Sequence, residues 1–498
     1  MGEKYDIVIV GSGLGGLVCG AILAKQGKTI CVLEKQHQIG GNLQVFSRKG
    51  CSFSAGMHYA GSLSKGQILY KVFSYLDIYN KLDIKHLDQK CFEKIYIGEK
   101  EYSYAAGMEN FKQNLIHFFP NEKEAIETYA RKLEEIWDAS DLLNLRDVNQ
   151  NEMQQFLEYE ENAYDYIESL TKNEDLKAVL ASTNGLYIGN KKTTPLYIHA
   201  NINKFFINSA WRIGDKGSTI ASLLSEIIEN NGGKVVTRTE VTNLNFDGAN
   251  IQSAQTKNGD RFFGSHFISN IHPLATLNLI EPGKVRKAYS HRIQNATNSI
   301  SAFTLYIVLK KREFKHINSN IYYSKNKNVW DSANYSTETW PQGYMMYTTE
   351  DELNIGYAES IVVISMMHFD DVRKWENTWV EKRGDDYKKF KTEKSEILLN
   401  LISIKFPDLK NAVDECFSAS PLTYRDYTHT FEGSMYGIVK DCNNPLGTFI
   451  SPFTKIPNLL LTGQNLSLHG MLGVIMTAFQ TCAGLININK LLAEIRNQ

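Results

Sequence analysis

Residues 6–16 read DIVIVGSGLGG, and this stretch decides the fold. An apolar run enters the pattern Gly-x-Gly-x-x-Gly, a helical run follows, and a second apolar stretch ends in Glu34. Strand, glycine turn, helix, strand and terminal acid are the dinucleotide-binding βαβ fingerprint. It predicts a Rossmann-like unit whose helix N-terminus holds the pyrophosphate of an adenine dinucleotide, because free N–H groups and the helix dipole favour anions.

The positions of this fingerprint have separate roles. Gly11 permits the tight turn, Gly13 lets the backbone approach the pyrophosphate, and Gly16 lets helix and strand pack closely. We expect Glu34 to accept both hydroxyls of the adenosine ribose. Its charge would repel a 2′-phosphate, which disfavours NADP as the tightly bound nucleotide. The other candidate contacts in this unit are Ser12, Leu14, Gly15 and Lys35.

Length, charge and cysteine use narrow the class of protein. A chain of 498 residues with 43% hydrophobic and 22% charged residues predicts a globular protein of two domains. Its net charge of −1 gives no reason to expect a nucleic-acid partner. The seven cysteines are scattered without metal spacing, so we expect a reducing compartment and no metal site. With no leader before Tyr5 and no membrane-spanning apolar run, a cytoplasmic location follows, with peripheral membrane contact left open.

Local patterns predict the elements between the two ends of the chain. Residues 107–190 are expected to be helical, with a helix starting at Asn121 in a capping box with Glu124. Residues 344–347 fit core packing better than the lining of a lipid pocket. A strand, a glycine-containing loop and a buried helix are expected over residues 458–486. The other expected elements are a strand pair at 44–61, a helix at 220–230, strands at 234–237 and 240–244, a meander at 250–272, strands at 299–309 and 360–368, and a helix at 387–406.

A second glycine pair, Gly40 and Gly41, follows the second strand and resembles the second fingerprint of the FAD-dependent amine oxidase and phytoene desaturase superfamily. The resemblance implies FAD, with this loop around the pyrophosphate. Asn42 stands where most members carry Arg. It also implies that the backbone of Val241 meets the adenine end and that a helix N-terminus near Val474 faces the flavin ring. The remaining implied contacts are Gly463, Gln464 and Gly473.

Two further segments resemble a subgroup of that superfamily, the retinol saturases and carotenoid isomerases. Residues 50–61 read GCSFSAGMHYAG and resemble the segment G-x-x-F-D-x-G-x-H-Y-x-G. Residues 461–465, LTGQN, followed by GMLG at 470–473, resemble L-T-G-Q-D and G-x-x-G. Departures from the pattern, which suggest a divergent relative, are Ser54, Gln44, Asn465 and the turn 215–217.

The resemblance implies a Rossmann-like FAD-binding domain with an inserted substrate domain of mixed sheet and helices. The implied boundaries are 1–85, 205–290 and 441–498 for the FAD domain, and 86–204 and 291–440 for the substrate domain. The implied activity is saturation or desaturation of C=C bonds in a polyene, retinoid or carotenoid-like lipid by hydride transfer at flavin N5. NAD(P)H is a candidate external reductant.

His58 and Tyr59 are the candidate catalytic residues, because a histidine that titrates near neutral pH or a tyrosine hydroxyl can pass a proton to the alkene. His469 and Gln464 are weaker candidates near the flavin, and His199 is expected to be structural. Three alternatives stay open: a carotenoid cis–trans isomerase that uses reduced FAD, a non-catalytic isoprenoid-binding escort protein, and an amine oxidase. The last is disfavoured because residues 465–469 contain no aromatic residue for an amine cage.

Overall fold

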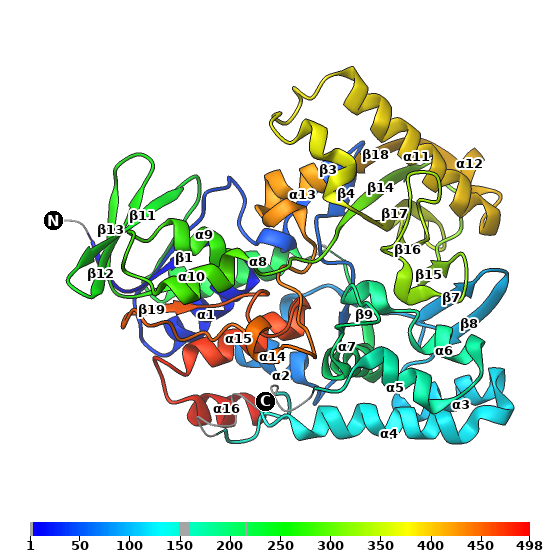
Figure 1. Cartoon of the computed structure of the whole chain (residues 1–498), viewed down its shortest axis with the longest axis horizontal. Helices are drawn as coiled ribbons and strands as arrows, with labels where there is room; N and C mark the ends of the chain where they lie inside the picture. The colour runs from blue at the N-terminus through cyan, green and yellow to red at the C-terminus, as the bar shows by residue number, and fades with distance from the viewer. Residues whose placement is uncertain (1–2, 149–159, 215–216) are drawn as a thin grey trace.

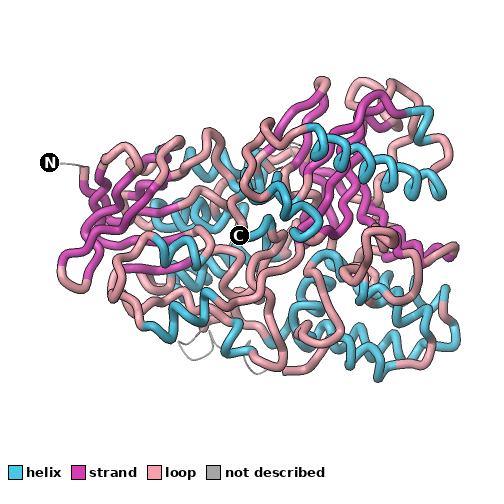
Figure 2. The backbone as a smooth tube through the Cα atoms, turned by 45° about the horizontal axis from the view of Figure 1, so that its top comes forward, coloured by secondary structure: helices cyan, strands magenta, loops and turns pink. Residues whose placement is uncertain are grey.

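The computed structural model describes residues 3–148, 160–214 and 217–498. Strands gather in two regions at opposite ends of the molecule, with helices around and between them (Figures 1 and 2). Each region is built on a seven-stranded sheet. Within the described residues, no helix combines the length and the apolarity needed to cross a bilayer.

The first sheet has a parallel core formed by both ends of the chain. Its strands run in the order β10 (Lys234–Val236), β2 (Ile30–Leu33), β1 (Lys4–Val10), β13 (Arg261–Ser269) and β19 (Leu459–Leu461). β2 is buried along its whole length, as expected for a strand covered on both faces. α1 (Leu14–Lys25) packs between α8 (Ser218–Asn230) and α15 (Gly470–Cys482). The predicted Rossmann-like fold is therefore confirmed.

β13 is the strand at which distant parts of the chain meet. On one edge it pairs with β1 from residue 263 to 269. On the other edge it pairs first with β12 (Asn250–Thr256) and then, at residues 267–269, with β19. β11 (Val241–Asp247) extends the antiparallel meander beyond β12, at the left of Figure 1. The carboxyl ends of β1, β13 and β19 consequently lie at one edge of the sheet.

The second sheet is mostly antiparallel. Its order is β18 (Val413–Ala419), β14 (Ser301–Leu309), β17 (Ala358–Met367), β16 (Gly343–Glu350), β15 (Asn320–Ser324), β7 (Glu93–Ile97) and β8 (Lys100–Tyr104). Every residue of β14 is buried, so this sheet is covered on both faces. α11 (Asp385–Lys405) lies over it at the top of Figure 1. β7 and β15 pair in parallel, which brings a segment near residue 93 beside one near residue 320.

Helices dominate residues 107–208, below the second sheet in Figure 1. They are α3 (Met108–Phe118), α4 (Lys123–Ala139), α5 (Ala163–Leu170), α6 (Glu174–Leu180) and α7 (Leu196–Asn208). The capping box expected at Asn121 is wrong: α4 begins at Lys123 and its N-cap, Glu122, makes no side-chain cap. Glu122 instead accepts a hydrogen bond from the Thr171 hydroxyl at 2.6 Å. A tertiary contact there overrides the local signal.

The remaining elements join these layers. The strand pair expected at 44–61 is present as β3 (Val45–Arg48) and β4 (Cys51–Ser54). A small sheet of β5 (Ala60–Gly61), β9 (Ala210–Ile213) and β6 (Ile84–His86) lies nearby. The other helices are α2 (Ile68–Tyr75), α9 (Pro273–Asn278), α10 (Lys287–Gln294), α12 (Leu409–Ala412), α13 (Pro421–Thr428), α14 (Pro445–Thr448) and α16 (Ile488–Arg496). Residues 215 and 216 of the divergent turn lie outside the described residues.

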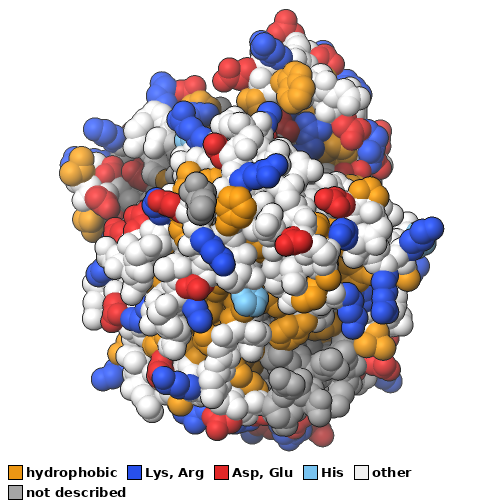
Figure 3. Space-filling model, turned by 90° about the vertical axis from the view of Figure 1, so that its left-hand side faces the viewer, with side chains coloured by type: hydrophobic (Ala, Val, Ile, Leu, Met, Phe, Trp, Pro, Cys, Tyr) orange, Lys and Arg blue, Asp and Glu red, His pale blue; other side chains and the backbone are white. Residues whose placement is uncertain are grey.

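Charges of both signs are interspersed on the face shown in Figure 3. Lysine and arginine side chains alternate there with aspartate and glutamate, and hydrophobic side chains lie between them. This mixture agrees with the net charge of −1. That face therefore carries no field of a single sign that would attract a polyanion.

Candidate functional site

A glycine turn joins β1 to α1 and forms the first part of the site. Gly11 has φ +96°, a conformation that glycine adopts without strain. A Cβ on Gly16 would lie 2.3 Å from the carbonyl oxygen of Gly11, so helix and turn are in backbone contact. Gly13 is the N-cap of α1 and makes no side-chain cap, which leaves the first N–H groups of the helix facing the turn. This is the geometry of an anion-binding helix N-terminus.

Glu34 follows β2 directly, and the glycine turn fixes its orientation. Its Oε2 accepts hydrogen bonds from the backbone N–H of Ser12 at 2.9 Å and from the Ser12 hydroxyl at 2.6 Å. Its Oε1 accepts one from the N–H of Gln36 at 2.8 Å. An ionised carboxylate offers about four lone-pair sites, so acceptor capacity remains for a ribose hydroxyl. The next residue, Lys35, is exposed, and partial desolvation lowers the pKa of its ammonium.

The second glycine pair lies directly against the first turn. The backbone N–H of Gly40 donates to the carbonyl of Ser12 at 3.0 Å. A Cβ on Gly41 would come within 3.2 Å of the Cα of Gly13. Asn42 turns toward the following segment, where its side chain packs on Gly56. The two glycine loops therefore form one continuous wall.

Val241 begins β11 beside the acidic end of this wall. The N–H of Thr239 donates to the carbonyl of Glu34 at 2.7 Å, and the N–H of Arg238 donates to that of Gln36 at 2.9 Å. These bonds clamp the β10–β11 connection onto the residues after β2. Val241 is thereby held near Glu34, where the adenosine half of a dinucleotide would lie.

The C-terminal loop closes the site from the other side. Gly463 has φ +101°, and a Cβ on Gly15 would lie 3.1 Å from the Cα of Gly463. Gln464 follows directly. The helix begins at Gly470 with His469 as N-cap, four residues before the expected Val474, which lies in the second turn. A Cβ on Gly473 would lie 2.5 Å from the backbone of Leu468, so this glycine lets the loop fold back on the helix.

Asn270 is a residue whose role the sequence did not indicate. It follows β13, and its side-chain amide donates to the carbonyl of Gly11 at 3.3 Å. Cβ atoms added to Gly13, Gly15 or Gly463 would each lie within 2.8 Å of its amide group. The only available signal was its position after a strand that pairs with β1, since ligands bind at the carboxyl ends of such strands.

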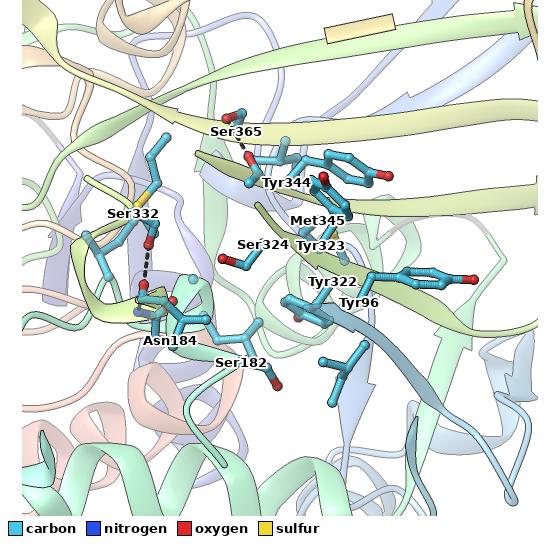
Figure 4. Close-up of a pocket in the computed structure, with 18 of the residues that line it drawn as sticks. Tyr96, Ser182, Asn184, Tyr322, Tyr323, Ser324, Ser332, Tyr344, Met345 and Ser365 are labelled. Carbon is cyan, nitrogen blue, oxygen red and sulfur yellow. Dashed lines mark hydrogen bonds between the residues drawn. The ribbon is translucent and has the colours of Figure 1, made fainter. Parts of the chain in front are cut away.

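A cavity with an empty volume of about 840 Å³ lies beneath the second sheet (Figure 4). Its walls are mostly aromatic and aliphatic, and include Tyr322, Tyr344, Met345, Met366 and Tyr436. Tyr344 and Met345 therefore line a pocket, although the sequence favoured core packing for residues 344–347. Met346 and Tyr347, by contrast, are buried in the core. Mostly apolar walls with a few polar groups are typical of sites for small apolar ligands.

A contact between two chain segments links the cavity wall to the loop that follows Gly463. Tyr436 lines the cavity, and a Cβ on the next residue, Gly437, would collide with the Asn465 side chain. Asn465 lies two residues after Gly463, and its Oδ1 accepts a hydrogen bond from the N–H of Ile438 at 3.1 Å. The loop after Gly463 is therefore in contact with the segment that contributes Tyr436 to the cavity wall.

His58 lines the cavity but does not titrate near neutral pH. Burial, with a smaller effect of the Arg212 charge, lowers the pKa of His58 to about 3. Its Nδ1 lies 3.3 Å from the Tyr347 hydroxyl. The expectation that this ring titrates near neutral pH does not agree with this pKa, because the ring is partly desolvated and lies near a positive charge. The neutral imidazole can still orient a ligand by hydrogen bonding.

Tyr59, the other candidate, belongs to a buried network of three side chains. Its hydroxyl lies 2.7 Å from Oε1 of Glu93 and 2.9 Å from the hydroxyl of Tyr322. Its ring stacks on Phe206 with centroids 4.2 Å apart. Glu93 is 1% exposed, and burial raises its pKa to about 8. The sequence gave no signal for Glu93, which reaches Tyr59 only through the pairing of β7 with β15.

Arg212, on β9, supports the segment that carries both candidates. It donates to the carbonyl of His58 and, at 2.8 Å, to Oδ1 of Asn320. Its guanidinium lies 4.5 Å from the centre of the Tyr347 ring. No described carboxylate lies within 4.0 Å of Arg212, so its positive charge is balanced by carbonyl dipoles and an aromatic face.

The other two candidate histidines have different surroundings. His469 stacks on Tyr436 at 4.4 Å, and its Nε2 lies 3.1 Å from the carbonyl of Leu186, so it borders the cavity. His199 is fully buried between the hydroxyls of Tyr129 and Tyr187, each 2.8 Å from a ring nitrogen. It does not line the cavity, which agrees with a structural role.

The fold and the glycine wall define a dinucleotide-binding protein of Rossmann type, and comparisons agree. Residues 9–76 match the family described as an NAD(P)-binding Rossmann-like domain. The chain is homologous over nearly its whole length to all-trans-retinol 13,14-reductase of Danio rerio, with 25% identity covering 97% of the chain and 86% of that protein.

Two other homologues carry names from carotenoid metabolism. Prolycopene isomerase 2 of an Oncidium hybrid is 24% identical over 54% of this chain and 48% of its own length. The 4,4′-diapophytoene desaturase of a Methylomonas species is 22% identical over 62% of each protein. The resemblance to this group that residues 50–61 and 461–473 suggested is therefore confirmed.

Solved structures share the fold at low identity. An oxidoreductase from Methanosarcina mazei superposes with a TM-score of 0.62 at 16% identity, covering 97% of this chain and 100% of that one. Cyclohexylamine oxidase from Brevibacterium oxydans gives 0.60 at 13% identity, covering 99% and 100%. Rab GDI from Plasmodium falciparum gives 0.54 at 12% identity, covering 98% and 99%. These likenesses show the architecture alone.

Proposed function

We propose that the protein is an FAD-dependent oxidoreductase that acts on C=C bonds of a polyene lipid of retinoid or carotenoid type. The observation that carries the proposal is that the loop after Gly463 contacts the segment that contributes Tyr436 to a mostly apolar cavity with hydroxyl groups in its wall. The homologues named for all-trans-retinol, prolycopene and diapophytoene support the same substrate class.

The residues present fit FAD. Glu34 would hold the adenosine ribose, the N-terminus of α1 the pyrophosphate, and the loop from Gly463 to Val474 the region of the flavin ring. The glycines of the wall leave no room for side chains, which is what a close-fitting pyrophosphate requires. Asn42 contributes no cation, so the backbone of Gly40 and Gly41 would provide the contacts to the pyrophosphate on that side of the site. A bound reduced flavin would supply a hydride to one carbon of the double bond.

The chain itself would orient the lipid, exclude water and provide the proton. The aromatic walls hold an uncharged polyene by apolar contact, and the enclosed space keeps water from the reacting carbons. The Tyr59 hydroxyl, at the cavity wall, is the candidate proton donor. His58, which is neutral, is the candidate for orienting the lipid.

One experiment tests this function directly. The purified protein should show a flavin absorption spectrum. After anaerobic reduction, it should be offered all-trans-retinol, a carotenoid and an unsaturated fatty acid in turn. We expect a polyene to reoxidise the flavin and to gain two hydrogen atoms by mass. If none of the three lipids reoxidises the flavin, the proposed substrate class is wrong.

Two alternatives have support of their own. Similarity to a prolycopene isomerase favours isomerisation with reduced FAD, which would leave the product mass unchanged. A lipid escort that performs no flavin chemistry is compatible with the architecture shared with a Rab GDI. A colourless purified protein that still binds a polyene would indicate the escort.

Three further points belong to this proposal. The predicted domain boundaries divide the chain between a flavin half and a lipid half. NAD(P)H is the candidate external reductant, and it would bleach the oxidised flavin under anaerobic conditions.

A cytoplasmic location with peripheral membrane contact is proposed because the substrate class partitions into membranes. Fractionation of cells into soluble and membrane pools would test the location.

A further inference from the structure

The geometry points to a proton relay in which Glu93 stores the proton and Tyr59, with Tyr322, delivers it to the lipid. The inference rests on the proposed function and adds the source of the proton. Glu93 would act through Tyr59, while the two tyrosines would touch the substrate.

The three groups form a line from the protein interior to the cavity. Tyr59 and Tyr322 both line the cavity, and their hydroxyl oxygens are 2.9 Å apart. Glu93 lies behind them at the start of β7, with one carboxyl oxygen 2.7 Å from the Tyr59 hydroxyl. Its side chain does not line the cavity. Tyr59 is therefore the group through which a proton from Glu93 would pass.

The surroundings of Glu93 favour the protonated acid. Its second oxygen, Oε2, is buried and makes no hydrogen bond of ordinary geometry, and Asn320, opposite it on β15, is the further side chain that interacts with the carboxyl group. A carboxylate charge that is buried away from water is costly, and protonation removes that charge. Burial accordingly raises the pKa of Glu93 to about 8, against smaller opposing effects of Tyr59, Asn320 and Arg212.

The groups that face Glu93 come from every element packed around it. Tyr104 lies opposite it on β8, and its hydroxyl is committed to the carbonyl of Val179. Asn320 lies opposite it on β15. Arg212 on β9 is the nearby cation. The charged side chains of α6 are engaged elsewhere, in the pairs Asp175–Lys100, Asp175–Lys327, Lys177–Glu168 and Lys177–Glu174.

The tyrosines would pass the proton without becoming ionised. Burial raises the pKa of Tyr59 and of Tyr322 well above 10, so neither forms a stable phenolate. Each hydroxyl must therefore receive a proton as it gives one away. The negative charge ends on Glu93, where the positive charge of Arg212 stabilises it.

The step balances as an addition to the alkene. A bound reduced flavin would supply one carbon with a hydride, which carries two electrons. The π electron pair then forms the second C–H bond with the tyrosine proton, and the O–H bond of that tyrosine breaks. The tyrosine is restored by a proton from Oε1 of Glu93, which becomes a carboxylate. After the product leaves, Glu93 regains a proton from water in the pocket through the same tyrosine hydroxyls. An acid that holds its proton at neutral pH favours saturation over desaturation.

Kinetics of flavin reoxidation test the relay. Reduced wild-type enzyme would be mixed with the polyene that it accepts, all-trans-retinol or a carotenoid, between pH 6 and pH 10. We expect the wild-type rate to fall about tenfold per pH unit above pH 8, since the acid is then ionised. Glu93→Gln should be slower by about 10²-fold or more and should lose that pH dependence.

Three further variants set the controls. Tyr59→Phe should match Glu93→Gln, and the double variant should be no slower, because both break the same path. The single variant Tyr59→Phe also provides the same test if Glu93→Gln does not fold. Tyr166→Phe removes a hydroxyl on α5, outside both the cavity and the relay, and should keep the wild-type profile. A Glu93→Gln profile equal to that of the wild type would overturn the relay.

An activity-independent measurement completes the test. The infrared difference spectrum between wild type and Glu93→Gln should contain the band of a protonated carboxyl group at pH 7 and lose it above pH 8. Absence of the band at pH 7 would refute the relay even in an active enzyme. If no alkene reoxidises the wild-type flavin, the proposed function fails and the relay fails with it. If the wild type reacts and the Glu93→Gln profile is unchanged, the relay alone fails.

Discussion

At the scale of single residues, Glu34 and Glu93 show how surroundings give one side chain two uses. Glu34 is buried and accepts three hydrogen bonds from backbone and hydroxyl donors. Glu93 is enclosed by aromatic rings, and one of its oxygens makes no hydrogen bond of ordinary geometry to the described residues. The first is arranged to accept hydrogen bonds from a ligand, while the second is arranged to keep a proton.

Replacing Glu34 by Gln should weaken FAD binding by about 10- to 100-fold, because hydrogen bonds to a charged acceptor are each worth about 1.5–3 kcal/mol. Titration calorimetry with FAD measures the change. Glu229→Gln, an exposed change on α8, is the matched control and should bind as the wild type does. Equal affinity in both variants would remove Glu34 from the binding site.

Glu93 should make stability depend on pH in a defined direction. Its pKa is about 8 in the folded protein and about 4.3 in an unfolded chain, so the folded state holds the proton more tightly. The stability that the wild type has relative to Glu93→Gln is complete below pH 4 and is lost as the pH rises toward 8. At its steepest, the difference in free energy of unfolding between the two proteins falls by about 1.4 kcal/mol per pH unit.

Urea unfolding of both proteins between pH 5 and pH 9 checks this expectation. The difference in unfolding free energy should decline up to about pH 8 and then level off. Glu124→Gln, an exposed change on α4, controls for the loss of a surface carboxylate. A difference that is constant across the range would show that Glu93 is ionised in the folded protein.

His58→Gln should leave the pH dependence of turnover between pH 5 and pH 8 unchanged. Burial lowers the pKa of His58 to about 3, so the ring stays neutral in that range. Glutamine can keep a hydrogen bond toward Tyr347, and we expect the rate to fall by less than about tenfold. Steady-state rates across pH measure this. Loss of a titration near neutral pH in this variant would restore His58 as the acid.

At the scale of elements, local sequence patterns predicted the helices and strands that depend on nearby residues. They did not predict residue roles that depend on the pairing of distant strands. The βαβ unit, the β3–β4 pair and α8 follow from short patterns of apolar residues and glycines, and all three are present. The start of α4 was misplaced because Glu122 bonds to Thr171 from another segment. Glu93 and Asn270 gained their roles from partners far along the chain, which no local pattern contains.

Gly16 in α1 should tolerate no side chain, because its Cβ would lie 2.3 Å from the carbonyl oxygen of Gly11. We expect Gly16→Ala to destabilise the protein by about 1–3 kcal/mol and to abolish FAD binding. Gly185→Ala, whose nearest neighbour would be 4.0 Å away, should do neither. Thermal melts with and without FAD distinguish the two. FAD binding by a stable Gly16→Ala protein would contradict the close packing.

At the scale of the whole molecule, both ends of the chain build the nucleotide site, while its middle builds the lipid cavity. β19 pairs with β13 only through residues 459–461, yet that short pairing places Gly463 against Gly15. The cavity depends on β7, β15 and β16, which belong to the other sheet. Binding at the two sites should therefore slow hydrogen exchange of different sets of backbone amides.

Hydrogen exchange followed by mass spectrometry should distinguish those sets of amides. FAD should slow exchange in residues 11–16 and 463–474 together, because one ligand bridges two segments from opposite ends of the chain. A polyene added afterwards should slow exchange in β15 and β16, where Tyr322 and Met345 meet it. Protection limited to residues 11–16 would show that the C-terminal loop does not contact the flavin. Protection of β15 and β16 by FAD alone would show that the cavity holds part of the nucleotide rather than the lipid.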